Sequence, residues 1–123
     1  ADVLVVAVAA TAETQGMIDK QVLNALGNDG FVVNIARGSL IHEAALLDAL
    51  EAGTIAGAGL DVFLNEPQID ARFLKLDNVF LVPHQGSATV ETRTGMAQTV
   101  KDNIDAFFAG MVPPTSITAK HFG

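Results

Sequence analysis

The sequence contains no cysteine, tryptophan or tyrosine, and only 7 of its 123 residues are lysine or arginine. The absence of cysteine excludes disulfides, thiol catalysis and cysteine-ligated metal sites. With 14 acidic residues the formal net charge is −7, so nucleic acid and anionic membrane surfaces find no basic patch to bind. We therefore expect small molecules or proteins as partners. A cytoplasmic location agrees with the lack of cysteine.

Long apolar runs are absent as well. No run approaches the ~20 residues that span a bilayer, and the apolar run at residues 1–10 lacks the basic region of a signal peptide. Apolar residues still make up 50% of the sequence, which predicts a densely packed aliphatic core. A valine-rich run that resembles a central sheet strand begins at residue 3, with no element before it. We therefore expect the chain to be a piece of a longer protein.

Strand-like and helix-like segments alternate along the chain. Asp19 and Gly27 are placed to cap and to stop a helix over residues 20–26. The apolar runs at 3–10 and 31–35 predict strands that are buried on both faces. Further strands are predicted at 55–63 and 79–82, and further helices at 43–52 and from Thr89 to near Gly110. This alternation predicts an α/β fold with a parallel sheet and a long last helix.

Charged side chains follow three of the predicted strands. Arg37 follows the second strand, Asp61 and Glu66 follow the third, and His84 follows the fourth. The carboxyl ends of parallel strands meet at one edge of the sheet, where open α/β sheets bind ligands. There Arg37 would hold a carboxylate, His84 would exchange a proton and Glu66 would orient the imidazole. The pattern predicts a site for an anionic substrate with a neighbouring carbonyl or hydroxyl.

Each residue also has a purely structural interpretation. Arg37 could form a surface ion pair, His84 could be a turn residue, Glu66 a solvated loop charge and Asp61 a cap for nearby amides. The other two histidines, His42 at a helix start and His121 in the tail, are interpreted as structural or solvated. The shared position of the first group at one sheet edge favours a functional site.

Three segments resemble the signature motifs of the D-isomer-specific 2-hydroxyacid dehydrogenases. They are V-N-I-A-R-G at 33–38, G-A-G-L-D-V-F-L-N-E-P at 57–67 and P-H-Q-G-S-A-T at 83–89. The likeness is strongest to the glyoxylate and hydroxypyruvate reductase branch and extends to about Gly110. It implies a Rossmann-like domain that uses NAD or NADP, with no indication of which. The implied reaction transfers hydride between the cofactor and a small 2-keto acid or D-2-hydroxy acid.

The resemblance also implies roles for individual residues. Arg37 matches the residue that binds the substrate carboxylate and carbonyl, His84 the general acid/base, and Glu66 the partner of that histidine. No metal ligand is implied. The positions that line the cofactor in the family match Val8, Ala9, Ile35, Ala36, Asp61 and Gly86.

The family's glycine-rich G-x-G-x-x-G turn is not found in this sequence. In the family this turn, the residue that reads the adenine ribose and the substrate-binding domain all precede the stretch that matches Val3. Residues 1–123 are therefore expected to be the second half of a dinucleotide-binding domain with its return helix. The parent should be an enzyme and a homodimer, and this piece alone should be inactive.

Two other functions stay open on the sequence. A catalytically silent regulator, similar to the family's corepressor relatives, could use the same fold to sense the nicotinamide cofactor. A complete flavodoxin-like domain would need a phosphate-binding turn after the first strand. Residues 11–14 suit that role poorly, because Glu13 places a carboxylate where a phosphate would lie.

Overall fold

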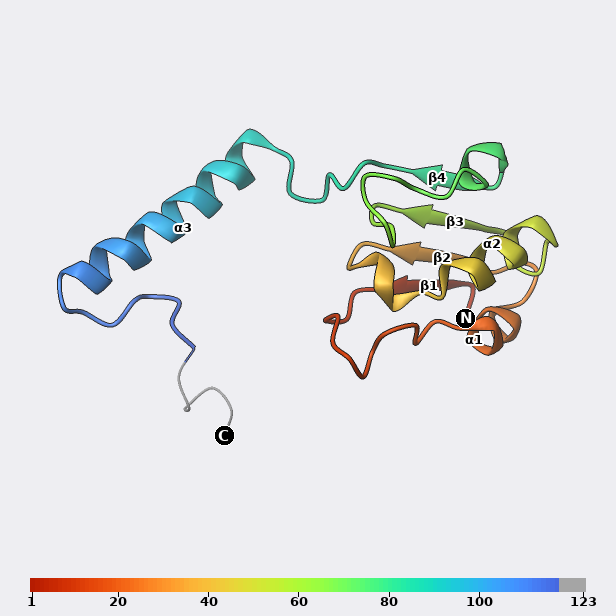
Figure 1. The fold of residues 1–123 in the computed structure, drawn as a ribbon, viewed down its shortest axis with the longest axis horizontal. Helices are drawn as coiled ribbons and strands as arrows, with labels where there is room; N and C mark the ends of the chain where they lie inside the picture. Colours follow the sequence, from red (N-terminus) through yellow and green to blue (C-terminus); the bar gives the residue numbers. More distant parts are fainter. Residues whose placement is uncertain (118–123) are drawn as a thin grey trace. The chain divides into compact units, whose positions relative to one another are not determined.

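A computed structural model describes residues 1–117, and the chain divides into two compact units after Gly86. The first unit holds four parallel strands in the order β1-β2-β3-β4 (Figure 1). Their bounds are Val3–Val6, Phe31–Asn34, Gly57–Leu60 and Val79–Leu81. The predicted parallel α/β fold of the Rossmann-like type is confirmed.

Two α-helices and two short 3-10 helices connect the strands. Helices α1 (Lys20–Leu26) and α2 (Glu43–Glu51) follow β1 and β2, and the 3-10 segments are η1 (Gly38–Leu40) and η2 (Phe73–Lys75). The side chain of Asp19 accepts the amide hydrogens of residues 21 and 22, and His42 Nδ1 accepts the Ala45 N–H at 3.3 Å. Local capping therefore fixes both helix starts, and the structural role expected of His42 is confirmed.

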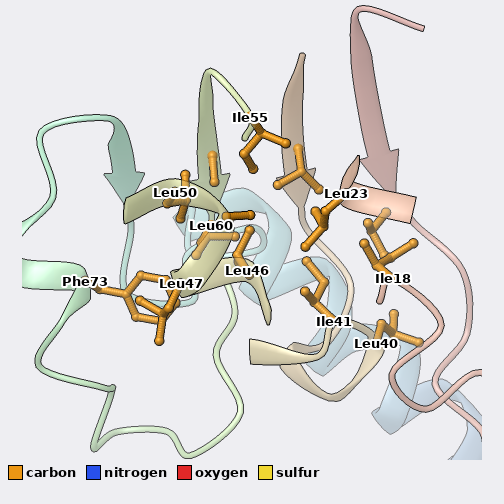
Figure 2. Close-up of a cluster of buried hydrophobic side chains, with 14 of the residues drawn as sticks. Ile18, Leu23, Leu40, Ile41, Leu46, Leu47, Leu50, Ile55, Leu60 and Phe73 are labelled. Carbon is orange, nitrogen blue, oxygen red and sulfur yellow. The ribbon is translucent and has the colours of Figure 1, made fainter. Parts of the chain in front are cut away.

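The hydrophobic core lies between the sheet and these two helices (Figure 2). Alternate strand residues contribute to it, because successive side chains of a strand point to opposite faces. The largest fully buried apolar side chains come from α1, α2, both 3-10 helices and the segment before β3: Leu23, Leu40, Leu46, Leu47, Ile55 and Phe73. The chain visits the strands in their spatial order, and parallel crossovers are nearly always right-handed. Both helices therefore cover the same face.

The opposite face of the sheet is open to solvent in the first unit. Val3 is 52% exposed, Val5 54%, Phe31 47% and Phe80 71%. The prediction that the first two strands are buried on both faces is therefore wrong for residues 1–86, since crossovers that all advance in one direction supply cover on one side. The predicted strand at 3–10 is also too long. β1 pairs with β2 only as far as Val6 opposite Asn34, where β2 turns into its loop.

The second unit contains helix α3 (Val90–Phe108). The side chain of Thr89 caps it by accepting the Thr92 N–H at 3.2 Å, as predicted, and Gly110 adopts a left-handed φ of 72° after its end. Its apolar stripe is exposed within this unit, including Met96, Val100 and Ile104. Among residues 1–117, no helix is both long and apolar enough to cross a membrane. His121 lies outside the described residues.

Candidate active site

Asn34 organises the loop that carries Arg37. Its side chain is 1% exposed; Nδ2 donates to the main-chain oxygen of Arg37 at 2.9 Å, and Oδ1 accepts the Ala36 N–H at 3.1 Å. The Arg37 side chain is exposed, and its Nη1 donates to the Ala36 oxygen at 2.6 Å. Within residues 1–117, Arg37 forms no ion pair with a carboxylate. The loop thus presents a guanidinium whose charge is not neutralised by a neighbour.

The loop after β3 packs directly on this first loop. A Cβ at Gly38 would collide with the carbonyl of Phe63, so only glycine allows the two backbones to approach this closely. From the other side, Glu43 Oε2 accepts the Leu64 N–H at 3.1 Å. These contacts set the distance between the Arg37 loop and the loop that carries Glu66.

Glu66 and His84 form a hydrogen-bonded carboxylate–imidazole pair at the centre of the site. His84 Nδ1 lies 2.7 Å from Glu66 Oε2, and Glu66 Oε1 accepts the Phe63 N–H at 2.8 Å. The hydrogen bond with His84, and then the one from Phe63, hold the pKa of the Glu66 carboxyl below its ordinary value. Glu66 is therefore an anion near neutral pH, oriented by two donors.

Arg37, Glu66 and His84 line one pocket of about 280 Å³. Its remaining lining residues are Gly38, Ser39, Phe63 and Leu64. The three residues follow the carboxyl ends of β2, β3 and β4, so the parallel sheet brings together side chains that are up to 47 positions apart. The pocket combines a cation with a carboxylate–imidazole pair. The cation can bind the carboxylate of a ligand, and the pair can transfer a proton to or from a neighbouring group of the same ligand.

A second pocket of about 310 Å³ also borders the Glu66–His84 pair. Apart from that pair its walls are apolar and come mainly from η2, β4 and the loop before η2: Phe63, Pro67, Ile69, Leu74, Leu81, Val82 and Pro83. The carboxylate–imidazole pair therefore stands between a polar pocket and an apolar one.

The positions expected to line a cofactor lie at the same sheet edge. Val8 and Ile35 follow the ends of β1 and β2 and are 42% and 58% exposed, while Ala9 and Ala36 adjoin them. Apolar side chains beside a sheet edge fit a flat nicotinamide ring. Asp61 is 8% exposed, and its carboxylate accepts the Gln85 and Gly86 amide hydrogens, as the capping interpretation describes. A role for these residues toward a cofactor stays a prediction.

The same residues do not fit the pyrophosphate of a dinucleotide. Gly57 and Gly59 lie inside β3 and form no turn at a helix start. A Cβ at Gly57 would collide with the Asn78 oxygen, whereas one at Gly59 would make only ordinary contacts. The residues present therefore fit the nicotinamide end of a dinucleotide and offer no glycine-rich phosphate turn.

The positioning roles of Asn34, Gly38 and Glu43 were not predicted from the sequence. Asn34 carried a signal, since a buried strand that ends in asparagine usually places that side chain against its own following backbone. The contacts of Gly38 and Glu43 are with a loop more than 20 residues away, and the sequence near either residue does not predict these contacts.

This architecture defines the class of domain: a parallel sheet with a polar pocket at its carboxyl edge, the place where dinucleotide-binding proteins bind their ligands. Residues 1–86 match the family model of the D-isomer specific 2-hydroxyacid dehydrogenase, NAD binding domain. The chain belongs to this family.

Curated relatives are named as reductases of 2-keto acids. The 2-ketogluconate reductase of Gluconobacter oxydans is 59% identical over 87% of this chain and 34% of its own length. The glyoxylate reductase of Pyrococcus furiosus is 47% identical over 94% of this chain and 34% of its own length. The chain thus spans about a third of the curated relatives it matches. These names do not favour the alternative of a silent regulator.

Solved structures agree. The NADPH-dependent glyoxylate/hydroxypyruvate reductase of Sinorhizobium meliloti, in complex with NADP and malonate, matches with a TM-score of 0.85 and 50% identity over 87% of this chain and 34% of its own. The D-lactate dehydrogenase of Lactobacillus jensenii with NAD+ matches with a TM-score of 0.84 and 27% identity over 96% of this chain and 40% of its own. Similar structures thus carry either cofactor, so the preference between NAD and NADP stays open.

Proposed function

We propose that residues 1–123 form the second half of the NAD(P)-binding domain of a 2-keto acid reductase of the glyoxylate or hydroxypyruvate class. The observation that carries this proposal is the pocket shared by Arg37, Glu66 and His84. The family assignment and the names of the relatives support it. On this view the remaining two thirds of the parent supply the glycine-rich turn and the substrate-binding domain.

Arg37 binds the substrate carboxylate. A guanidinium can hold a carboxylate through two parallel hydrogen bonds, and this one has no acidic partner among the described residues. Its positive charge also stabilises negative charge that develops on the neighbouring keto oxygen during reduction. Arg37 therefore both selects a 2-keto acid and stabilises the transition state of its reduction.

His84 moves the proton. Because Nδ1 is held by Glu66 at 2.7 Å, Nε2 is the ring nitrogen left for the substrate. The carboxylate of Glu66 fixes the tautomer and the orientation of the ring, and it stabilises the imidazolium that donates a proton to the keto oxygen. When bound, the nicotinamide cofactor supplies the hydride. In the reverse direction Nε2 accepts the proton of a D-2-hydroxy acid.

We assign Val8, Ala9, Ile35, Ala36, Asp61 and Gly86 to the wall that would face the nicotinamide end of the cofactor. Their position at the carboxyl edge of β1 to β4 supports this assignment. On this assignment the choice between NAD and NADP would be made by a ribose-reading segment elsewhere in the parent.

We also propose that the parent is a cytoplasmic homodimer. Exposed apolar side chains on the open face of the sheet and along α3 support a contact at these surfaces, either with a second copy or with the rest of the parent, because exposed apolar surface usually marks a contact. Light scattering on the parent should give the mass of a dimer, and a monodisperse monomer would contradict the proposal.

The activity is tested by following the oxidation of NADH and NADPH with glyoxylate, hydroxypyruvate and 2-ketogluconate in the parent. His84→Gln should lower kcat by ~100-fold or more, because general acid catalysis is worth at least that much. Arg37→Lys should chiefly raise KM, because an ammonium cannot make the bidentate contact. Arg72→Lys, at an exposed ion pair with Asp48, is the matched control and should leave both constants unchanged. Failure to turn over any 2-keto acid would favour the regulator.

A further inference from the structure

The turn that carries His84 has an unusual backbone. His84 has a φ of 53°, in the left-handed region that residues with a side chain rarely adopt. Such a conformation persists only where the surrounding contacts enforce it. Contacts with the rest of the fold must therefore hold this turn in place.

Both ends of the turn are attached to the carboxyl end of β3. On the entry side, the Val82 N–H donates to the Leu60 oxygen at 2.9 Å. On the exit side, Asp61 Oδ1 accepts the Gln85 N–H at 2.6 Å and Oδ2 accepts the Gly86 N–H at 2.9 Å. Two consecutive residues of one strand end thus hold the segment before His84 and the segment after it.

Asp61 itself is firmly placed. It is 8% exposed, and its own N–H donates to the Asn34 oxygen at 3.0 Å, which continues the β2–β3 ladder by one residue. Each carboxylate oxygen accepts a charge-assisted hydrogen bond from a separate amide, and this fixes the direction of both amides. The fit is tight: a Cβ at Gly86 would lie 3.1 Å from Asp61 Oδ2.

We propose that Asp61 is the positioning residue of the proton-transfer site: its carboxylate locks the turn at residues 84–86 so that the His84 imidazole meets Glu66. The inference rests on the proposed function insofar as His84 is the general acid/base. Each carboxylate oxygen keeps a second lone pair, so the lock is compatible with Asp61 also facing a cofactor. The role is distinct from that contact, because it acts through the backbone of the turn.

The variant Asp61→Asn tests the lock on the 123-residue chain. Asparagine keeps one oxygen as acceptor, but its NH2 group faces the second amide hydrogen, so one of the two hydrogen bonds that hold the exit side of the turn is lost. The readout is the NMR titration of the Glu66 carboxyl in protein whose core resonances show that it is folded.

Two explanations predict opposite results. The negative charge of Asp61 raises the pKa of Glu66, whereas the hydrogen bond with His84 is the largest cause that lowers it. Loss of charge alone would therefore lower the Glu66 pKa, and loss of the positioned histidine raises it. We expect the pKa to rise, and the scalar couplings of His84 to lose the signature of a positive φ. A fall or no change in folded Asp61→Asn overturns the proposal.

Asp70→Asn is the matched control. It removes the same charge and the ion pair of Asp70 Oδ2 with Arg72 Nε at 3.5 Å, while the asparagine oxygen can still accept the Arg72 N–H as Asp70 Oδ1 does at 2.9 Å. Within the described residues the Asp70 side chain makes no hydrogen bond to the His84 turn. It should leave the Glu66 titration in place. An equal rise in both variants would overturn the proposal.

A measurement on the unaltered chain decides the matter if Asp61→Asn does not fold. The Gln85 and Gly86 amide hydrogens should exchange with solvent much more slowly than that of Gln68, an exposed loop residue whose N–H donates to no acceptor within residues 1–117. Exchange as fast as Gln68 would overturn the proposal. Because none of these readouts is turnover, a negative activity assay and a negative result here remain distinguishable.

Discussion

The side-chain amide of Asn34 donates a 2.9 Å hydrogen bond to the main-chain oxygen of Arg37. The same side chain accepts the Ala36 N–H, so a fully buried asparagine closes the loop from within and determines where the arginine projects. The residue that positions the candidate substrate-binding cation thus sits at the last position of β2 and never touches the pocket itself.

Asn34→Leu should destabilise the first unit. Leucine has a similar volume but leaves the Arg37 oxygen and the Ala36 N–H without their partners, and an unsatisfied buried group costs about 1–3 kcal/mol. Urea unfolding should show this loss. Asn24→Leu, on the exposed side of α1, is the control and should change the free energy of unfolding by less than about 0.5 kcal/mol. Equal losses in both variants would contradict the role given to Asn34.

Gly38→Ala should be strongly destabilising, because the added Cβ would collide with the Phe63 carbonyl and neither backbone is free to move away. The same exchange at Gly95, inside α3 with open space around its Cβ position, should raise helix stability by about 1 kcal/mol. Thermal unfolding followed by circular dichroism reports both. Opposite signs are expected, and a neutral Gly38→Ala would show that the two loops are less closely packed than described.

The Glu66 carboxyl should titrate below its ordinary value of 4.5. Because its pKa is lowered in the folded state, its contribution to stability is present above the unfolded-state pKa and disappears as the pH falls through the folded-state pKa. His84→Ala removes the largest cause and should move the midpoint upward, part of the way, since the bond from Phe63 remains. Carboxyl-detected NMR measures the midpoint in both proteins. An unchanged midpoint would mean that the pair is not formed in solution.

Calorimetry of the 123-residue chain with NADH or NADPH should show little binding. Helix starts after glycine-rich turns supply the amide hydrogens that bind a pyrophosphate, and this sequence has no such turn. Submicromolar affinity would contradict the assignment of the chain to half of a cofactor site.

The elements that the sequence predicts best are those that local chemistry defines. Helix α1 lies at 20–26 as predicted, because Asp19 and Gly27 cap it through contacts within four residues. The strands are shorter than predicted: the run at 55–63 contains only Gly57–Leu60 as strand, because pairing ends where the neighbours end. The 3-10 segments were missed, since their stability comes from tertiary packing of residues such as Phe73.

The residues that line the candidate pocket were predictable, but the geometry that holds them was not. A parallel sheet gathers the residues that follow its strands, so Arg37, Glu66 and His84 were expected at one edge. That Asp61 would accept two amides 24 and 25 positions away depends on the path of a turn that no local pattern specifies.

The strand order β1-β2-β3-β4 has a consequence for how this sheet assembles. Each strand pairs with the one that precedes it in the chain, within about 30 residues, so no pairing has to wait for a strand that is synthesised later. A ribosome releases the strands in the order in which the sheet needs them. The sheet can therefore grow at one edge during synthesis, and the edge that receives β4, and with it His84, is completed last.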